Sequence, residues 1–397
     1  MTNTVSEGLP AHQNVSIHFL EEEAIVFERE AQSLFAVNST AAAVWCGLEQ
    51  KFPPNQVAAG LSERFGIDVE TARSYVADVL RQWRRARHGD ESIHFDIIKH
   101  DGDAELLERK LIEKPKDFDV QQRHRLLDTL FVLRYRSFEL ATLTEQVLGH
   151  LDDHKEASMH RAVLDIGPFD DGFAVSNGND VLAYCSDINQ VASMVKAAMI
   201  ERSLSDADEF CAVHAAAVVR DNVCILLPGE TGAGKSCLAA GLLAEGFELL
   251  GDDTAVLSHD GLCVRPLPFG ICVKANGSDV LSSRFPALKG LDFHDRADGK
   301  RVQYITPPEV QLAGLHSRLP VDYIVFPRYS AEGGTEMFPI NTMPAIRKLL
   351  KCFFPLGEDL GSEDVDRLID WIDQTTCFDL RFSNLTDAVN RLSRLEK

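Results

Sequence analysis

The sequence predicts a multidomain protein of mixed α/β and α+β class, and three observations support that prediction. The chain has 397 residues, which is long for a single hydrophobic core. Its N-terminal part reads as short strands followed by three helices, which is typical of a winged-helix-like domain. A glycine-rich loop stands much later, between an apolar strand and a helix. We therefore expect three domains: a recognition domain over residues 1–90, an α+β intermediate domain over 91–205 and an α/β catalytic domain over 206–397.

The composition narrows the classes of partner and compartment. The formal net charge of −21 disfavours nucleic acid as a partner, because a negative field repels its backbone. There is no apolar run of membrane-spanning length and no signal segment in "MTNTVSEGLP", so we expect no membrane association. The nine cysteines are scattered without a C-x-x-C pair, which favours the reducing cytoplasm over a disulfide framework. A homo-oligomer stays open.

The N-terminal segment reads as a small unit over residues 15–88. Strands are expected in "AIVFERE" and "SLFAVN", and a helix capped by Asn38 or Ser39 follows them. A second helix should stop at Gly66. The apolar residues of the third helix recur on one face, namely Ala72, Tyr75, Val76, Val79, Leu80 and Trp83. Residues 1–90 hold 8 Lys and Arg against 12 Asp and Glu, which argues against a DNA-binding role.

This segment resembles the PqqD-like domains, the leader-peptide recognition elements of peptide-modifying enzymes. The resemblance is carried by "LFAVN" running into "STAAAVW" and by the spacing of the helices that follow. It implies that residues 15–88 bind the leader of a precursor peptide. In such domains the leader adds as a strand to the edge of the sheet, where backbone hydrogen bonds provide affinity.

The middle segment carries no catalytic signature. Strands are expected in "LFVLRYRSF" and in a hairpin that turns at Asn177-Gly178-Asn179-Asp180. Helices are expected in "ELATLTEQVLGHLDDH" and "DINQVASMVKAAMIERSL". The polar stretch "HDGDAELLERKLIEKPKDFD" reads as a linker or surface excursion.

The most specific motif is a phosphate-binding loop with the pattern G-x-x-x-x-G-K-S. The apolar strand "NVCILL" precedes it, and the helix "KSCLAAGLLAEG" begins at its end and presents its positive end to phosphates. The lysine contributes positive charge and the serine hydroxyl is a ligand for Mg²⁺. The residues expected to bind a nucleotide are Gly229, Glu230, Thr231, Gly232, Ala233, Gly234, Lys235 and Ser236.

Two adjacent aspartates point to phosphoryl transfer. Asp252 and Asp253 end the strand "FELLGDD", 17 and 18 residues after Lys235. Successive side chains of a strand point to opposite sides, so one carboxylate can face the metal and the other the acceptor hydroxyl. The alternative is an acidic turn after a strand, with the second aspartate as a cap.

His214 lies in the apolar run "CAVHAAAVV", 21 residues before Lys235. A lone histidine there is most often a core residue. Pairing of its strand with "NVCILL" across the turn at Arg220-Asp221-Asn222 would instead bring it beside the phosphate loop.

His214, the loop and the Asp252–Asp253 pair resemble, in order and spacing, the HPr kinase/phosphorylase family and the kinases of lasso-peptide clusters. The resemblance implies that Asp252 is the general base and that His214 orients it. It also implies that Ser236 and Asp253, with Asp252 beside them, hold Mg²⁺ and that Lys235 stabilises the transferred phosphoryl group. The glycine-rich C-terminal signature of that family has no counterpart. The segment "RPLPFGICVKANG" stands in its place, so the resemblance does not extend to a phosphorylase activity or to HPr as the substrate, and its Lys274 is a candidate phosphate contact.

Together the two resemblances predict a kinase that uses ATP and Mg²⁺ to phosphorylate a serine or threonine of a ribosomally made precursor peptide. The leader would be held by the N-terminal domain, which raises the effective concentration of the acceptor at the site. One alternative is an HPr-type protein kinase or a small-molecule kinase. Another is a nucleotide-gated peptide-binding adaptor without catalysis, although an adaptor does not need the two aspartates.

Overall fold

The fold was analysed in a computed structural model of the full chain. The structure describes residues 15–20, 23–30, 32–86, 93–94, 117–151, 160–308, 311–312, 314, 317–357 and 359–397. The chain divides into two compact units. Unit 1 contains residues 1–96, 341–351 and 358–374, and unit 2 contains residues 97–340, 352–357 and 375–397. The mixed α/β and α+β class predicted from the sequence is confirmed. A boundary at residue 205 stays a prediction, because residues 97–340 fall in one unit.

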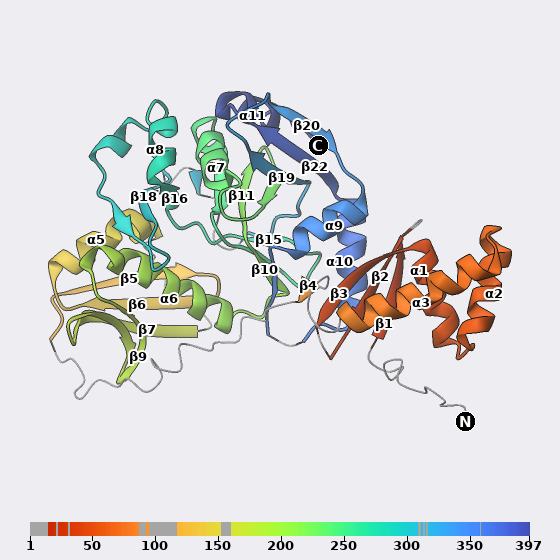
Figure 1. The fold of residues 1–397 in the computed structure, drawn as a ribbon. Coiled ribbons are helices and arrows are strands. Elements are labelled where there is room, and N and C mark those ends of the chain that lie inside the picture. The colour runs from red at the N-terminus through yellow and green to blue at the C-terminus, as the bar shows by residue number, and fades with distance from the viewer. Residues whose placement is uncertain are drawn as a thin grey trace. The chain divides into compact units, whose positions relative to one another are not determined.

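Unit 1 is built from an antiparallel sheet, three helices that follow it in sequence, and two helices from far along the chain (Figure 1). The strand order is β1-β2-β3-β4, with β1 Val15–Leu20, β2 Glu23–Glu28, β3 Ser33–Asn38 and β4 Ile93–His94. The helices are α1 Ser39–Glu49, α2 Pro54–Phe65, α3 Val69–Ala86, α9 Thr342–Leu350 and α10 Ser362–Gln374. The order of strands followed by three helices confirms the predicted N-terminal architecture, to which β1 and β4 add two strands that were not predicted.

Local sequence signals explain where the helices of the N-terminal domain begin and end. The side chain of Asn38 accepts a hydrogen bond from the Ala41 N–H at 2.9 Å, so Asn38 rather than Ser39 caps α1. Gly66 ends α2 in the left-handed conformation, with φ of 65°. On α3, Ala72, Val76 and Val79 are buried as expected, whereas Tyr75 is 44% exposed. The apolar stripe is thus narrower than predicted. The side chain of Trp83 lies outside the described residues.

Helices α9 and α10 pack with the N-terminal domain through polar contacts. The Gln32 side-chain amide accepts a hydrogen bond from the Leu360 N–H at 2.9 Å and donates one to the Leu360 carbonyl at 3.2 Å. The His18 ring donates a hydrogen bond to Asp366, and Arg347 lies 3.4 Å from a Glu23 carboxylate oxygen. Unit 1 therefore includes residues 341–351 and 358–374, which no sequence pattern predicted to pack with the N-terminal domain.

Unit 2 begins with a five-stranded sheet in the order β5-β6-β7-β8-β9. Its strands are β5 Val120–Leu126, β6 Thr129–Tyr135, β7 His160–Phe169, β8 Gly172–Asn177 and β9 Asp180–Cys185. Its helices are α5 Phe138–Leu148 and α6 Val191–Asp206, with short 3₁₀ turns at Gly149–Leu151 and Ile188–Gln190. The predicted hairpin turn is confirmed, with Gly178 at φ of 66° between β8 and β9. The expected linker falls outside the described residues up to residue 116.

A six-stranded mixed sheet in the order β13-β11-β12-β19-β22-β20 carries the phosphate loop. Its strands are β11 Ala215–Arg220, β12 Val223–Pro228, β13 Glu248–Gly251, β19 Tyr323–Tyr329, β20 Glu336–Pro339 and β22 Thr376–Phe382. Helices α7 Lys235–Ala244 and α11 Leu385–Leu392 pack together beside it. Their buried apolar residues and those of β11 and β12 form one core, so the loop starts from a rigid base.

Two smaller sheets complete unit 2. One has the order β15-β14-β10-β21, with β10 Cys211–Val213, β14 Ala255–Leu257, β15 Val264–Arg265 and β21 Phe353–Pro355. The other has the order β16-β18-β17, with β16 Ile271–Lys274, β17 His294–Asp295 and β18 Arg301–Ile305. Helix α8 Ala275–Leu281 and a 3₁₀ turn at Pro286–Gly290 lie between β16 and β17 in the chain. Buried residues from α5, α6, β16 and β18 share one core, which joins the five-stranded sheet to this three-stranded sheet.

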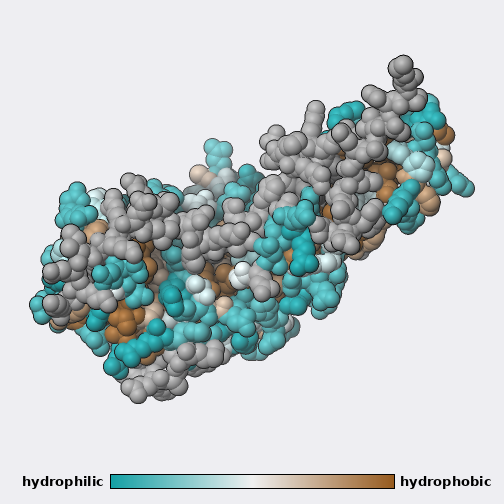
Figure 2. Space-filling model, turned by 90° about the horizontal axis from the view of Figure 1, so that it is seen from below, coloured by the Kyte–Doolittle hydropathy of each residue, from teal (hydrophilic) through white to brown (hydrophobic). Residues whose placement is uncertain are grey.

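The helices, the surface and the cysteines agree with what the composition predicts. Within the described part of the chain, no helix has both the length and the apolar character needed to span a bilayer. On the face drawn in Figure 2, hydrophilic residues predominate among those coloured and apolar residues form separate small patches. All nine cysteines lie within the described residues, and none of them forms a disulfide.

His124 in β5 gives the fold a testable dependence on pH. The ring is fully buried, and burial together with the charge of His150 lowers the pKa of His124 to about 4. Its neutral form therefore stabilises the folded state above the unfolded pKa of about 6.5, and this contribution is lost as the pH falls toward 4. We expect the change His124→Gln to reduce the loss of unfolding free energy between about pH 7 and pH 4.5 by about 2 kcal/mol. Urea unfolding at the two pH values measures it.

The matched control is His160→Gln, since His160 is exposed at the start of β7. Equal pH dependence of wild type and His124→Gln would contradict the account of a buried neutral histidine.

Candidate active site

The phosphate loop connects the end of β12 at Pro228 to the start of α7 at Lys235. Gly232 and Gly234 have φ of 97° and 96°, a conformation that residues with a Cβ rarely adopt. A Cβ at Gly234 would also lie 2.6 Å from the ring of Phe382. The loop thus takes the conformation in which backbone N–H groups of a glycine-rich turn surround an anion.

Lys235 is held inside the loop by its own backbone. The ammonium donates hydrogen bonds to the carbonyl oxygens of Gly229 at 2.5 Å and Glu230 at 3.2 Å, and it lies 3.0 Å from Nε2 of His214. The side chain is 5% exposed, and this burial lowers the pKa of Lys235. The cation is therefore positioned before any ligand enters, as electrostatic preorganisation requires.

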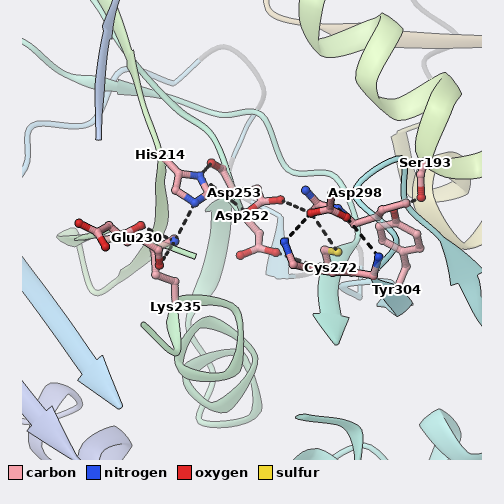
Figure 3. Close-up of polar contacts among 12 residues, drawn as sticks. Ser193, His214, Glu230, Lys235, Asp252, Asp253, Cys272, Asp298 and Tyr304 are labelled. Carbon is pink, nitrogen blue, oxygen red and sulfur yellow. Dashed lines mark hydrogen bonds and ion pairs between the residues drawn. The ribbon is translucent and has the colours of Figure 1, made fainter. Parts of the chain in front are cut away.

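His214 stands between β10 and β11 and faces the loop (Figure 3). The antiparallel pairing of β11 with β12 across the turn at residues 221–222 is confirmed, and it sets the His214 carbonyl 3.3 Å from the Gly229 N–H. Nδ1 donates to the Asp253 carbonyl at 2.8 Å and lies 3.8 Å from the Asp253 carboxylate. Burial, and then the charge of Lys235, lowers the pKa of His214, so the ring is neutral at neutral pH. The resemblance implies that His214 orients Asp252, whereas its hydrogen-bond partner in the structure is Asp253.

Asp252 follows β13 and is only 1% exposed. Its Oδ2 accepts a hydrogen bond from the Cys272 N–H at 2.9 Å, and its Oδ1 has no hydrogen-bond partner among the described residues. Burial and the neighbouring charge of Asp253 raise the pKa of Asp252 to about 6, although the nearby Ser236 side chain opposes that shift. Asp252 therefore lies behind the loop, on the side of Ser236.

Asp253 is turned the other way and contacts cations. Its φ of 73° is unusual for a residue with a side chain and marks local strain. The carboxylate lies 3.1 Å from the Arg296 guanidinium and is 28% exposed. Burial alone would raise the pKa of Asp253, but nearby cations, Lys196 first among them, outweigh it and lower that pKa. Asp253 thus stays ionised, whereas its neighbour titrates closer to neutrality, which is a common arrangement of paired carboxylates at active sites.

A buried lysine on α6 places a positive charge near Asp252 and Asp253. Lys196 on α6 is 6% exposed, with its ammonium 5.5 Å from the centroids of the Phe269 and Tyr304 rings. The Tyr304 hydroxyl hydrogen-bonds Ser193, one turn earlier on α6, at 3.0 Å (Figure 3). Tyr304 also pairs with Cys272 across β16 and β18, and the Cys272 N–H binds Asp252. Helix α6 therefore contributes a cation to the base of the site, and β18 contributes an aromatic contact.

The site opens into a cavity of about 450 Å³. The predicted residues that line it are His214, Thr231, Gly232, Gly234, Lys235, Ser236, Asp253 and Lys274. Gly229, Glu230 and Ala233 form the loop behind this lining, and Asp252 lies behind Ser236. The structure thus brings the predicted residues to one place and divides the two aspartates between the cavity and the interior.

Sequence reasoning missed three cations of the site. Arg296 and Lys300 line the cavity from the turn between β17 and β18, where the Arg296 N–H donates to the Lys300 carbonyl at 2.9 Å. Both are also tied to Asp298, and Lys196 reaches the site from α6. The one available signal was the charge pattern "HDRADGKR", which reads equally well as a solvated turn.

The donors present fit Mg²⁺. The Ser236 hydroxyl and the two carboxylates supply oxygen ligands, and the unpartnered, buried Oδ1 of Asp252 is an acceptor that needs a partner. Among the described residues there is no cluster of three or more His, Cys, Asp or Glu side chains that would bind a metal alone. Mg²⁺ ordinarily takes one or two carboxylates and completes its shell with water and phosphate oxygens.

A family model and a solved structure are similar to parts of the chain. Residues 23–88 match the family model of coenzyme PQQ synthesis protein D (PqqD), which confirms the predicted PqqD-like domain. A solved structure, the Hpr(Ser) kinase/phosphatase from Coxiella burnetii, is similar at 13% sequence identity and a TM-score of 0.21, over 46% of this chain and 95% of that chain. No curated protein matches this chain.

The burial of Lys196 near two carboxylates predicts energetic coupling. We expect the change Lys196→Met to lower the free energy of unfolding by about 3 kcal/mol, because it leaves buried negative charge uncompensated. Adding Asp253→Asn should then cost less than it does alone, by about 1 kcal/mol or more. Chemical denaturation of the wild type, both single variants and the double variant measures this coupling. Additive losses would show that the two side chains act independently.

Proposed function

We propose that this protein is an ATP- and Mg²⁺-dependent kinase that phosphorylates a serine or threonine hydroxyl of a precursor peptide. The N-terminal domain would hold the leader of that peptide. The cytoplasm is the compartment that nine cysteines without a disulfide favour. The finding that carries the proposal is the convergence, on one cavity, of a phosphate loop, its buried lysine and an ionised aspartate held by His214 and Arg296.

The geometry supports a division of roles between the two aspartates. Asp253 lines the cavity, so we assign it to the acceptor hydroxyl, which it would orient and from which it would accept the proton. Asp252 lies behind Ser236, so we assign it, with Ser236, to the side that holds Mg²⁺. The sequence resemblance implied the reverse allocation. Mg²⁺ supplies neutralisation of the phosphate charge when it is bound.

Three lysines of the cavity are assigned to stabilise the negative charge of the phosphates. Lys235 is placed to stabilise the negative charge of the phosphoryl group during transfer, and Lys274 and Lys300 add positive charge along the same cavity. Neutral His214 fixes the backbone of Asp253 through its Nδ1–H. The bond between the terminal phosphorus of ATP and its bridging oxygen would break as the acceptor oxygen bonds to that phosphorus. ADP would leave and Asp253 would take the acceptor proton, so positioning matters more than acid–base strength.

The PqqD-like domain supports a peptide as the acceptor. An added strand at the edge of the β1–β4 sheet would hold the leader through backbone hydrogen bonds. The acceptor segment then needs little affinity of its own. A pool of long peptides that contain serine and threonine, incubated with the protein and MgATP, tests the activity. Mass spectrometry should find phosphopeptides that share a sequence on the N-terminal side of the acceptor.

The roles of the aspartates predict different defects. We expect Asp253→Asn to lower phosphoryl transfer by about 10²- to 10⁴-fold while MgATP still binds, because only the acceptor side is lost. Asp252→Asn should instead raise the Mg²⁺ concentration needed for half-maximal rate. Rates over a range of Mg²⁺, with calorimetry of nucleotide binding, separate the two. An Asp252→Asn protein whose transfer rate falls by about 10²- to 10⁴-fold at an unchanged Mg²⁺ requirement would restore the allocation implied by the resemblance.

Leader capture predicts inhibition by the leader alone. The N-terminal part of the best substrate, synthesised without its acceptor, should compete with the whole substrate because both occupy one strand-binding edge. It should leave turnover of the isolated acceptor part unchanged. A scrambled leader is the control, and inhibition of both substrates alike would argue against tethering. Deletion of residues 1–90 is a poorer test, because α9 and α10 pack with that domain.

A further inference from the structure

The cavity beside the phosphate loop has an apolar wall, and we propose that this wall binds the base of a purine nucleotide. The central residues of the wall are Tyr329 at the end of β19 and Val280 on α8. The inference rests on the proposed kinase function. It adds the site for the part of the phosphoryl donor that the loop itself does not hold.

Exposure sets these two residues apart. Tyr329 and Val280 are each 52% exposed. In unit 2, the described residues include two other large hydrophobic side chains that are exposed, Phe138 and Leu182, and neither lines the cavity. Large apolar side chains exposed within a concave site, beside a few polar groups, are typical of a small-molecule pocket.

The Tyr329 ring is held in place beside the loop. The Tyr329 N–H donates to the Ala233 carbonyl at 3.1 Å, and its ring lies edge-on to Phe382 with centroids 5.6 Å apart. Phe382 also closes on Gly234, where an added Cβ would be 2.6 Å from its ring. The ring is therefore fixed next to the phosphate loop, so a base that stacks on it need not order a mobile side chain.

The opposite part of the wall comes from two helices that are joined to each other. Arg284, just after α8, donates to the Thr386 hydroxyl of α11 at 3.0 Å. This contact brings Val280 of α8 and Leu385 of α11 to the same cavity. Since Lys235 and Ser236 of the loop supply the polar lining for phosphates, the apolar wall is left for a flat ring system.

Few polar groups are available to read the edge of the base. The Ser383 hydroxyl already donates to the Gly333 carbonyl at 2.6 Å, and Asn276 supplies an amide to the lining. The volume of about 450 Å³ lies within the range of nucleotide-sized pockets. Stacking would thus contribute most of the affinity for the base, as it does where aromatic side chains bind nucleobases.

The test compares a ligand that has a base with one that lacks it. Calorimetry would measure binding of a non-hydrolysable MgATP analogue and of magnesium tripolyphosphate to wild type, Tyr329→Ala and Tyr329→Phe. We expect Tyr329→Ala to weaken binding of the ATP analogue by about 5- to 150-fold, the range for loss of one base–aromatic stack. Tripolyphosphate should bind unchanged, Tyr329→Phe should bind the analogue like wild type, and the exposed-aromatic control Phe138→Ala should change neither.

Two results would overturn the inference alone. Either ATP-analogue binding is unaffected by Tyr329→Ala, or both ligands weaken equally, which would mean that Tyr329 acts only through the loop. If wild type binds neither ligand, the proposed kinase function fails as well. Val280→Ser gives a second variant on another element, with weaker binding of the analogue alone expected. Photolabelling with an 8-azidoadenine nucleotide should modify the peptides that contain residues 280 and 329, and labelling elsewhere would contradict the proposal.

Discussion

The active site depends on the register between β11 and β12. Pairing of Ala215 with Pro228 sets the residue before one strand opposite the first glycine of the loop, so the His214 carbonyl meets the Gly229 N–H. The His214 ring then reaches both the Lys235 ammonium and the Asp253 carbonyl. A slip of one residue would turn His214 to the other face of the sheet and separate all three.

Electrostatic balance at the site is the second constraint. The chain as a whole carries a net charge of −21, yet Lys235, Lys274, Arg296 and Lys300 line a single cavity. The carboxylates of Asp253, which lines the cavity, and Asp252, which is buried, partly offset this positive charge. The surplus of cations suits a ligand with several negative charges, and it localises attraction for phosphate in a molecule that repels polyanions elsewhere. Burial and paired cations shift the pKa values of Asp252 and Asp253 in opposite directions, so the two chemically identical side chains titrate in different pH ranges.

Local signals predicted the parts of this site that are close in sequence. The loop, its flanking strand and helix, the Asn38 cap and the turns at Gly66 and Gly178 each require particular residue types at fixed spacing. Contacts that depend on tertiary packing could not be predicted in this way. Lys196 reads as an ordinary surface lysine of an amphipathic helix, and Arg296 as part of a solvated turn, until the fold brings both beside Asp253. The pairing of His214 with Asp253 rather than Asp252 depends on the left-handed backbone of Asp253, which no sequence pattern announced.

The PqqD-like domain is connected to the rest of the chain at more than one place. Residues 341–351 and 358–374 belong to unit 1, whereas the short stretch between them, 352–357, returns to unit 2 as β21. β21 pairs with β10, and the carbonyl of its preceding residue, Cys352, accepts the His214 N–H at 2.6 Å. Helix α9, which packs with the PqqD-like domain, therefore ends at Leu350, two residues before the residue that fixes the His214 backbone. Two residues of chain and one hydrogen bond thus join the end of α9 to the backbone of His214, the residue on which the arrangement of Lys235 and Asp253 depends.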